Sequence, residues 1–98
     1  MQHILSIAGS DSGCGAGLQA DLKTITALGG YALTAVTAVT AQNTRGVTAV
    51  QPISVYQVIA QMEAIFSDIR VDAVKIGMIC NSDQVIAISD FLGKVKRG

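Results

Sequence analysis

The chain has 98 residues, enough for one small domain, and its seven Lys and Arg residues balance its seven Asp and Glu residues. Nucleic-acid binding draws much of its affinity from phosphate neutralisation, so a chain whose basic residues gather only at Lys94, Lys96 and Arg97 is not expected to bind nucleic acid. Its apolar runs are far shorter than the roughly 20 residues that cross a bilayer, so no membrane span is expected.

The composition is apolar for so short a chain. Half of the residues are hydrophobic, 14% are charged, and the mean hydropathy is +0.48. Buried parallel strands read as continuous apolar runs, so this profile predicts part of a larger α/β sheet. Cys14 and Cys80 form no CxxC pair, and with no signal-peptide pattern at the start we expect free thiols in a cytoplasmic protein.

The first unit of the chain reads as strand, loop and helix. Residues 4–8 form the predicted strand, and residues 9–17 form a loop rich in Gly and Ser. The helix that follows has apolar residues at helical spacing: Leu18, Leu22, Ile25 and Leu28. Gly29 and Gly30 are expected to end it, because glycine accepts the left-handed conformation common at helix ends.

A second strand is expected over residues 34–40, where Val and Thr alternate with Ala. β-branched side chains lose freedom in helices and favour strands. Residues 42–46 read as a loop, and residues 47–50 as a short extra strand that Pro52 ends.

The remaining units are a helix, a strand and a further helix. Ser54 is the predicted N-cap of the first helix, with Gln57 as its capping-box partner. The buried stripe of this helix comprises Val55, Val58, Ile59, Met62, Ile65 and Phe66. Residues 73–77 form the third main strand. Asn81 or Ser82 caps the last helix, whose apolar face comprises Val85, Ile88, Leu92 and Val95.

Three strand–helix units predict right-handed crossovers and a mostly parallel sheet. The chain stops at Gly98, where a fourth strand would begin. We therefore expect an incomplete α/β domain with an uncovered sheet edge.

Ligands of parallel α/β sheets bind at the carboxyl ends of the strands, which here are followed by residues 9–17, 42–46 and 78–82. The glycine loop fits G-x-G-x-x-G only loosely when Gly15 and Gly17 are used, and it lacks the Gly-Lys-Ser/Thr of a P-loop. On spacing alone it is a ligand-binding loop or merely a tight turn.

Several side chains near these loops could serve a site. Gln42 offers a donor and an acceptor side by side, which complements an aminopyrimidine edge, although a loop Gln is often solvated. Asp21 is a ligand candidate or a helix-surface charge favoured by the helix dipole. Lys75 lies inside a strand, so it needs Asp72 or Asp21 as a partner, or must reach solvent. Met78 would form an apolar wall. No cluster has metal-ligand spacing, so no metal site is expected.

Three blocks of the sequence resemble the hydroxymethylpyrimidine/phosphomethylpyrimidine kinases of thiamine biosynthesis, in the family's order and spacing. They are residues 7–24, residues 38–47, and residues 66–68 with 75–78. Gly13 and Cys14 depart from the commonest Ser-Gly-Gly form of the first block, but both residues are small. The resemblance implies a three-layer αβα ribokinase-like fold, of which residues 1–98 would be the N-terminal, substrate-side part, with the first three βα units.

The resemblance also implies ATP-dependent phosphorylation of 4-amino-5-hydroxymethyl-2-methylpyrimidine and then of its monophosphate, with Mg²⁺. It implies that Gln42 hydrogen-bonds the pyrimidine and that Gly9, Ala16, Asp21 and Met78 lie around the same pocket. The glycine loop is then a substrate wall and not a cradle for ATP.

The family's Gly-Thr-Gly-Cys-type motif and its ATP-binding loops are absent from the sequence, so we expect no catalytic residue in this chain and no activity from it alone. Two alternatives stay open: a pyridoxal or pyridoxine kinase of the same superfamily, and a non-catalytic pyrimidine-binding module. The uncovered sheet edge and zero net charge favour a homo-oligomer.

Overall fold

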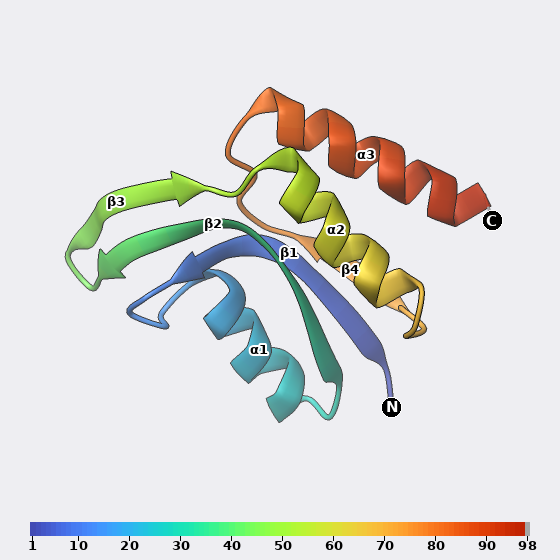
Figure 1. Cartoon of the computed structure of the whole chain (residues 1–98). Helices are drawn as coiled ribbons and strands as arrows, with labels where there is room; N and C mark the ends of the chain where they lie inside the picture. Colours follow the sequence, from blue (N-terminus) through green and yellow to red (C-terminus); the bar gives the residue numbers. More distant parts are fainter. Residues whose placement is uncertain (98) are drawn as a thin grey trace.

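A mixed sheet of four strands, in the order β3-β2-β1-β4, forms the centre of the computed structural model (Figure 1), which describes residues 1–97. The elements in chain order are β1 (His3–Asp11), α1 (Gly17–Ala27), β2 (Tyr31–Asn43), β3 (Gly46–Pro52), α2 (Val55–Phe66), β4 (Ala73–Ile76) and α3 (Ser82–Arg97). β1 runs parallel to both β2 and β4, whereas β3 is antiparallel to β2. The predicted α/β class and mostly parallel sheet are confirmed.

Helices cover both faces of the sheet. α1 lies on one face, and α2 and α3 lie together on the other (Figure 1). The main core fills the space between the sheet and the α2–α3 layer, and its buried members are Leu5, Ile7, Leu33, Ala35, Val58, Met62 and Ile88. Burying a large aliphatic side chain stabilises a fold by about 1.5–3 kcal/mol, so this layer accounts for much of the folding free energy.

The helix ends follow part of the predicted capping chemistry: Ser54 and Asn81 act as N-caps, and of the capping box at Ser54 only the bond to the Ser54 hydroxyl is present among the described residues. The Ser54 hydroxyl accepts a hydrogen bond from the Gln57 amide at 3.2 Å, at the start of α2. The Asn81 side chain accepts from the Gln84 amide at 2.9 Å, which identifies Asn81 as the cap of α3. Gly29 follows the end of α1 with φ of +86°, as expected for a helix-terminating glycine.

β1, β2 and β3 are longer than the sequence predicts, whereas β4 ends at Ile76, one residue earlier than predicted. β1 continues through Gly9 and Ser10 to Asp11, so only residues 12–16 form the connection to α1. β2 extends three residues beyond the predicted range at each end. Two residues of β2, Thr37 and Ala38, stand opposite the single Gly9 of β1, which makes a bulge in the parallel ladder. Hydrogen bonding to the neighbouring strand, which no local pattern encodes, extends both strands.

Some residues that the sequence placed on the buried apolar faces of α1 and α3 are exposed in the structure. Leu28 is 83% exposed because α1 ends at Ala27 and the chain has left the helix by that point, and Leu22 is partly exposed as well. In α3, Ile88 is buried as predicted, but Val85 is 46% exposed and Val95 is also exposed. The buried position in the first turn of α3 belongs to Gln84 instead.

β4 is an edge strand in the described part of the chain, since it pairs with β1 and no further strand follows it in the sheet order. Val74 and Ile76 are consequently more than a third exposed. The Lys75 side chain, for which the sequence left solvent exposure or an acidic partner open, is 58% exposed on this edge.

Candidate functional site

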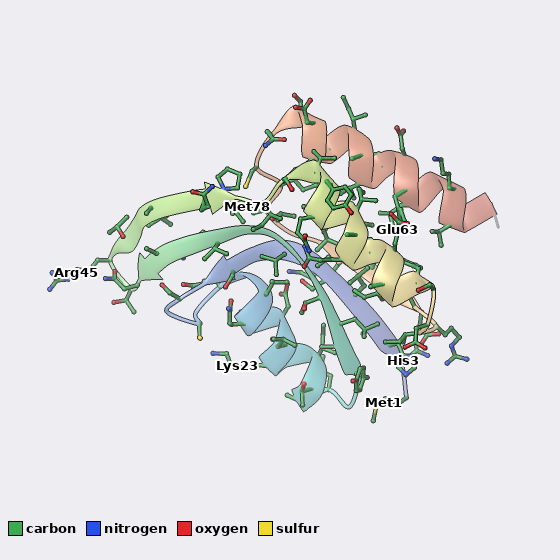
Figure 2. The ribbon with its side chains drawn as sticks, in the orientation of Figure 1. Met1, His3, Lys23, Arg45, Glu63 and Met78 are labelled. Carbon is green, nitrogen blue, oxygen red and sulfur yellow. The ribbon has the colours of Figure 1, made fainter. Side chains whose placement is uncertain are left out.

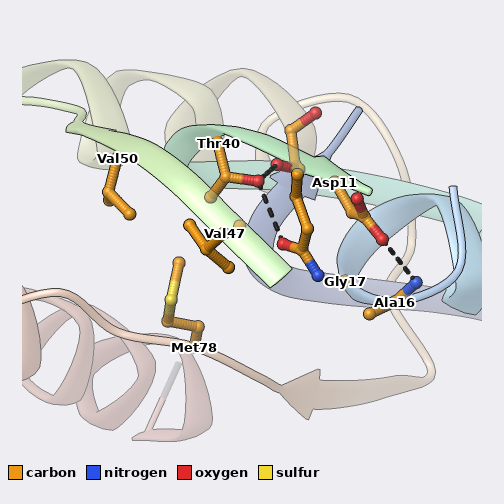
Figure 3. A pocket seen from close by; sticks show the side chains of 10 residues that line it. Asp11, Ala16, Gly17, Thr40, Val47, Val50 and Met78 are labelled. Carbon is orange, nitrogen blue, oxygen red and sulfur yellow. Dashed lines mark hydrogen bonds between the residues drawn. The ribbon is translucent and has the colours of Figure 1, made fainter. Parts of the chain in front are cut away.

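A cavity of about 170 Å³ lies where β1 and β2 end, at the sheet edge where parallel α/β proteins bind ligands (Figure 3). Its β1 side and the start of α1 contribute Gly9, Ser10, Asp11, Ala16 and Gly17. Its other walls come from β2, β3 and the segment after β4, through Thr40, Gln42, Val47, Val50 and Met78. Its lining is mainly apolar, which suits contact with the faces of a small substituted ring.

The apolar walls come from two segments that are distant in sequence. Val47 and Val50 are on β3, and the Met78 side chain points toward them from the segment between β4 and α3 (Figure 3). Figure 2 shows Met78 in the whole molecule, together with Arg45 at the turn of the β2–β3 hairpin. A Cβ at position 9 would lie 2.5 Å from the Met78 Cε. Gly9 therefore lets Met78 close one side of the cavity.

Gln42 supplies an amide group at the end of β2. Its Oε1 lies 3.2 Å from the Thr40 hydroxyl, which is 2.7 Å from the Ser10 carbonyl. Since a hydroxyl has one proton and Ser10 is closer, Gln42 keeps hydrogen-bonding capacity for a ligand. The Gln42 backbone is clamped: its N–H donates to the Ser12 hydroxyl, and that hydroxyl donates to the Gln42 carbonyl, both at 2.7 Å.

The Asp11 carboxylate organises the glycine loop. One oxygen accepts from the Gly13 amide at 2.8 Å, and the other accepts from the amides of Gly15 and Ala16 at 3.0 and 2.8 Å. Asp11 is only 4% exposed. Its own amide donates to the Gln19 side chain at 2.8 Å, which ties the end of β1 to α1.

These contacts decide what the loop can bind. Backbone amides of a glycine loop can hold a phosphate, but here the amides of Gly13, Gly15 and Ala16 already bind a carboxylate of the same chain. This agrees with the expectation of a wall and not an ATP cradle. Sequence reasoning missed Asp11, although an Asp directly before Ser-Gly is a recognisable turn signal, because its side chain can bond backbone two residues on.

Asp21 lies in a different place from the other candidates. Gly9, Ala16, Gln42 and Met78 line the cavity, whereas the Asp21 carboxylate faces the sheet beneath α1. It accepts hydrogen bonds from the Ser6 hydroxyl and from the Lys75 ammonium, both at 2.7 Å. Asp21 thus bridges α1 to β1 and β4, and the partner of Lys75 that the sequence left open is Asp21.

The environment of Asp21 shifts its pKa downward. Partial burial raises the pKa, but the hydrogen bonds from Lys75 and Ser6 and the positive charge of Lys75 outweigh it, so the pKa of Asp21 lies below its ordinary value. The carboxylate is therefore charged throughout the physiological range.

Residues 1–97 contain neither a metal-binding cluster nor a membrane-spanning helix. No group of three or more His, Cys, Asp or Glu side chains among them is arranged to hold a metal ion. None of their helices combines the length and apolar character needed to span a bilayer.

Comparison with known proteins gives consistent matches over nearly the whole chain. The family model described as phosphomethylpyrimidine kinase matches residues 11–98. A hydroxymethylpyrimidine/phosphomethylpyrimidine kinase of Rhizobium meliloti is 62% identical over 88 residues, which are 90% of this chain and 33% of that protein. The chain thus spans about a third of the length of such curated relatives.

Solved structures show the same fold. The phosphomethylpyrimidine kinase of Clostridium difficile is 48% identical with a TM-score of 0.92, over 96% of this chain and 41% of that one. An ADP complex of Bacillus subtilis pyridoxal kinase is 37% identical with a TM-score of 0.87, over 96% of this chain and 36% of that one. The expected ribokinase-like architecture is confirmed.

Asp11→Asn should destabilise the protein by about 1–3 kcal/mol, because the amide replaces one acceptor oxygen by an NH₂ group that faces backbone N–H donors. Urea unfolding measures the loss. Asp90→Asn, on the exposed face of α3, is the matched control and should change the free energy of unfolding by less than about 0.5 kcal/mol. Equal effects of the two substitutions would contradict the role of Asp11.

Asp21→Asn should cost about 0.5 kcal/mol at neutral pH, a small value because Lys75 is largely exposed and solvent screens the pair. The folded-state pKa of Asp21 is lowered, so its stabilisation is present above the unfolded pKa of about 3.9 and disappears as the pH falls through the folded value. Urea unfolding from pH 7 to pH 2 measures the free energy of unfolding of Asp21→Asn and of the unmodified protein. The two values should become equal at low pH. A constant difference across this range would rule out the ionised bridge.

Proposed function

The chain belongs to the phosphomethylpyrimidine kinase family, and we propose that it forms the pyrimidine-binding part of an enzyme that phosphorylates 4-amino-5-hydroxymethyl-2-methylpyrimidine and its monophosphate with ATP. The observation that carries this proposal is the Gln42 amide at the rim of a small apolar cavity. An aminopyrimidine edge presents a donor beside an acceptor, and the Gln side chain presents the complement.

The cavity walls support the same substrate class. Met78, Val47 and Val50 offer apolar surface to the faces of a planar ring and its methyl group. Gly9 and Ala16 contribute small residues that leave room for the ring. We assign these residues and Gln42 to pyrimidine contact. The place of Asp21 around the bound substrate stays a prediction. Its hydrogen bonds to Ser6 and Lys75 support a structural role, in which Asp21 holds α1 against β1 and β4.

The family uses ATP as the phosphate donor, and Mg²⁺ would neutralise charge on the transferred group. The residues described here do not fit either group: the loop amides hold Asp11, and residues 1–97 lack an acidic or His cluster for a metal. We therefore assign both groups to parts of the enzyme other than this chain. The contribution of this chain is to bind and orient the pyrimidine and to exclude water from its faces.

A second candidate is phosphorylation of pyridoxal. The similarity to pyridoxal kinases of Bacillus subtilis and Staphylococcus aureus, at 37% and 32% identity, favours keeping it. Pyridoxal is also a small substituted heterocycle, so the apolar walls do not discriminate. A non-catalytic pyrimidine-binding module would show the same binding with no phosphorylation by any longer form of the protein.

Gln42→Ala should abolish or weaken at least tenfold the binding of hydroxymethylpyrimidine, because the amide that pairs with the ring edge is removed. Calorimetric titration of the protein measures the affinity. Gln51→Ala, on an exposed part of β3, is the matched control and should bind like the unmodified protein. Absence of binding by the folded, unmodified protein would contradict the proposed site, and preference for pyridoxal in a competing titration would favour the second candidate.

We also propose that the protein acts in the cytoplasm and self-associates. Val74 and Ile76 on the β4 edge, and Val39 on β2, are exposed apolar side chains that favour association. Light scattering should give a mass above that of a monomer, and a monomeric mass at high protein concentration would refute self-association.

A further inference from the structure

Gln84 is a fully buried polar side chain in the first turn of α3, outside the cavity described above. A buried amide group is costly unless its donors and its acceptor are hydrogen-bonded, and all of them are satisfied here. Its Oε1 accepts from the Cys80 amide at 2.9 Å. Its Nε2 donates to the carbonyls of Thr37 and Ile53, at 2.9 and 2.8 Å.

These bonds join three segments of the chain: the connection after β4, strand β2, and the residue after β3. Each segment either lines the cavity or lies next to a residue range that lines it. Cys80 belongs to the connection between β4 and α3 that carries Met78. Ile53 directly follows β3, which carries Val47 and Val50, and its amide donates to the Thr37 carbonyl at 2.9 Å. Thr37 lies at the β2 bulge opposite Gly9. The Gln84 side chain therefore ties the segment that carries Met78 to β2. It also ties this segment to Ile53, the residue after β3, which is the strand of Val47 and Val50.

Thr37 completes the link to Met78. Its side chain is fully buried, and its hydroxyl donates to the Met78 carbonyl at 2.7 Å. Residues 77–80 form neither helix nor strand, so this segment has no regular backbone ladder to hold it. A few bonds hold it: Gly77 donates to the Ile7 carbonyl, Thr37 donates to the Met78 carbonyl, and Cys80 donates through its amide to Gln84 and through its thiol, at 3.8 Å, to the Thr37 carbonyl.

We propose that Gln84 is a positioning residue of the cavity: with Thr37 it holds the Met78 segment at the spacing from β3 that a flat heterocycle requires. Methionine is unbranched and flexible, so the position of this wall is determined by its backbone and not by side-chain stiffness. Loss of the Gln84 bonds would leave the Cys80 amide without its partner and would loosen the segment that carries Met78, two residues away. The inference deepens the proposed function and rests on it for the choice of ligand.

The test compares Gln84→Leu with Gln61→Leu. The Gln61 side chain makes a similar bridge from α2 to β2, accepting from the Val36 amide at 2.8 Å and donating to the Val36 carbonyl at 3.0 Å. It bonds the residue before Thr37 but does not contact the Met78 segment through these bonds. The two variants thus lose similar helix-to-strand hydrogen bonds at neighbouring positions, and only one loses an anchor of the Met78 segment.

The first readout is NMR of the methionine ε-methyl groups in the absence of ligand. Met78 reports on the cavity wall, and Met62, which is fully buried in the core, reports on the fold. We expect Gln84→Leu to move or broaden the Met78 signal while the Met62 signal stays in place. Gln61→Leu should leave Met78 unchanged. An unchanged Met78 signal in Gln84→Leu, or an equal change in both variants, would overturn the proposal.

The second readout is calorimetric affinity for hydroxymethylpyrimidine, which should fall about tenfold in Gln84→Leu and stay unchanged in Gln61→Leu. If the unmodified protein fails to bind the pyrimidine, the proposed function fails, while the methyl signals still decide the positioning role. If Gln84→Leu fails to fold, Thr37→Val replaces it, because it removes the bond to the Met78 carbonyl with almost no change in shape. That variant should displace the Met78 signal, and an unaltered signal would again refute the proposal.

Discussion

Parallel pairing of β1 with β2 on one side and β4 on the other is the constraint on which the rest of the structure depends. It brings the carboxyl ends of three strands to one edge, so that the segments after them meet although up to about seventy residues separate them in the chain. Leu5 and Ile7 on β1 are fully buried, which fixes the register of this strand against its neighbours. The cavity exists because three chain segments are held at that edge.

Internal polar groups stabilise the irregular segments around the cavity. The Asp11 carboxylate satisfies the amides of residues 13, 15 and 16, and the Gln84 amide satisfies carbonyls and an amide from three segments. Buried backbone groups without partners would cost free energy, so each segment needs such an anchor. These anchors hold the segments that form the cavity walls to the sheet and to the helices.

The accuracy of sequence reasoning differed between elements for physical reasons. Capping at Ser54 and the glycine after α1 were predictable because they depend on a few neighbouring residues. The exposure of Leu28 and Val85 was not, because it depends on where a helix ends and on what packs against it. In the same way, the sequence left the environment of Lys75 open, and only the sheet order showed that β4 is an edge strand on which this side chain is largely exposed.

The sequence by itself determined the α/β class and the family, because local patterns and motif blocks carry that information. Through the resemblance it also named Gly9, Ala16, Gln42 and Met78 as substrate-binding candidates, and these four line the cavity while their role stays a prediction. Only the tertiary structure decided that Asp11 fills the glycine-loop amides, that Asp21 pairs with Lys75 beneath α1, and that Gln84 links three segments. Each of these is a contact whose formation depends on the sheet register and on helix placement. Such contacts arise when distant segments are packed together, and no spacing along the chain encodes them.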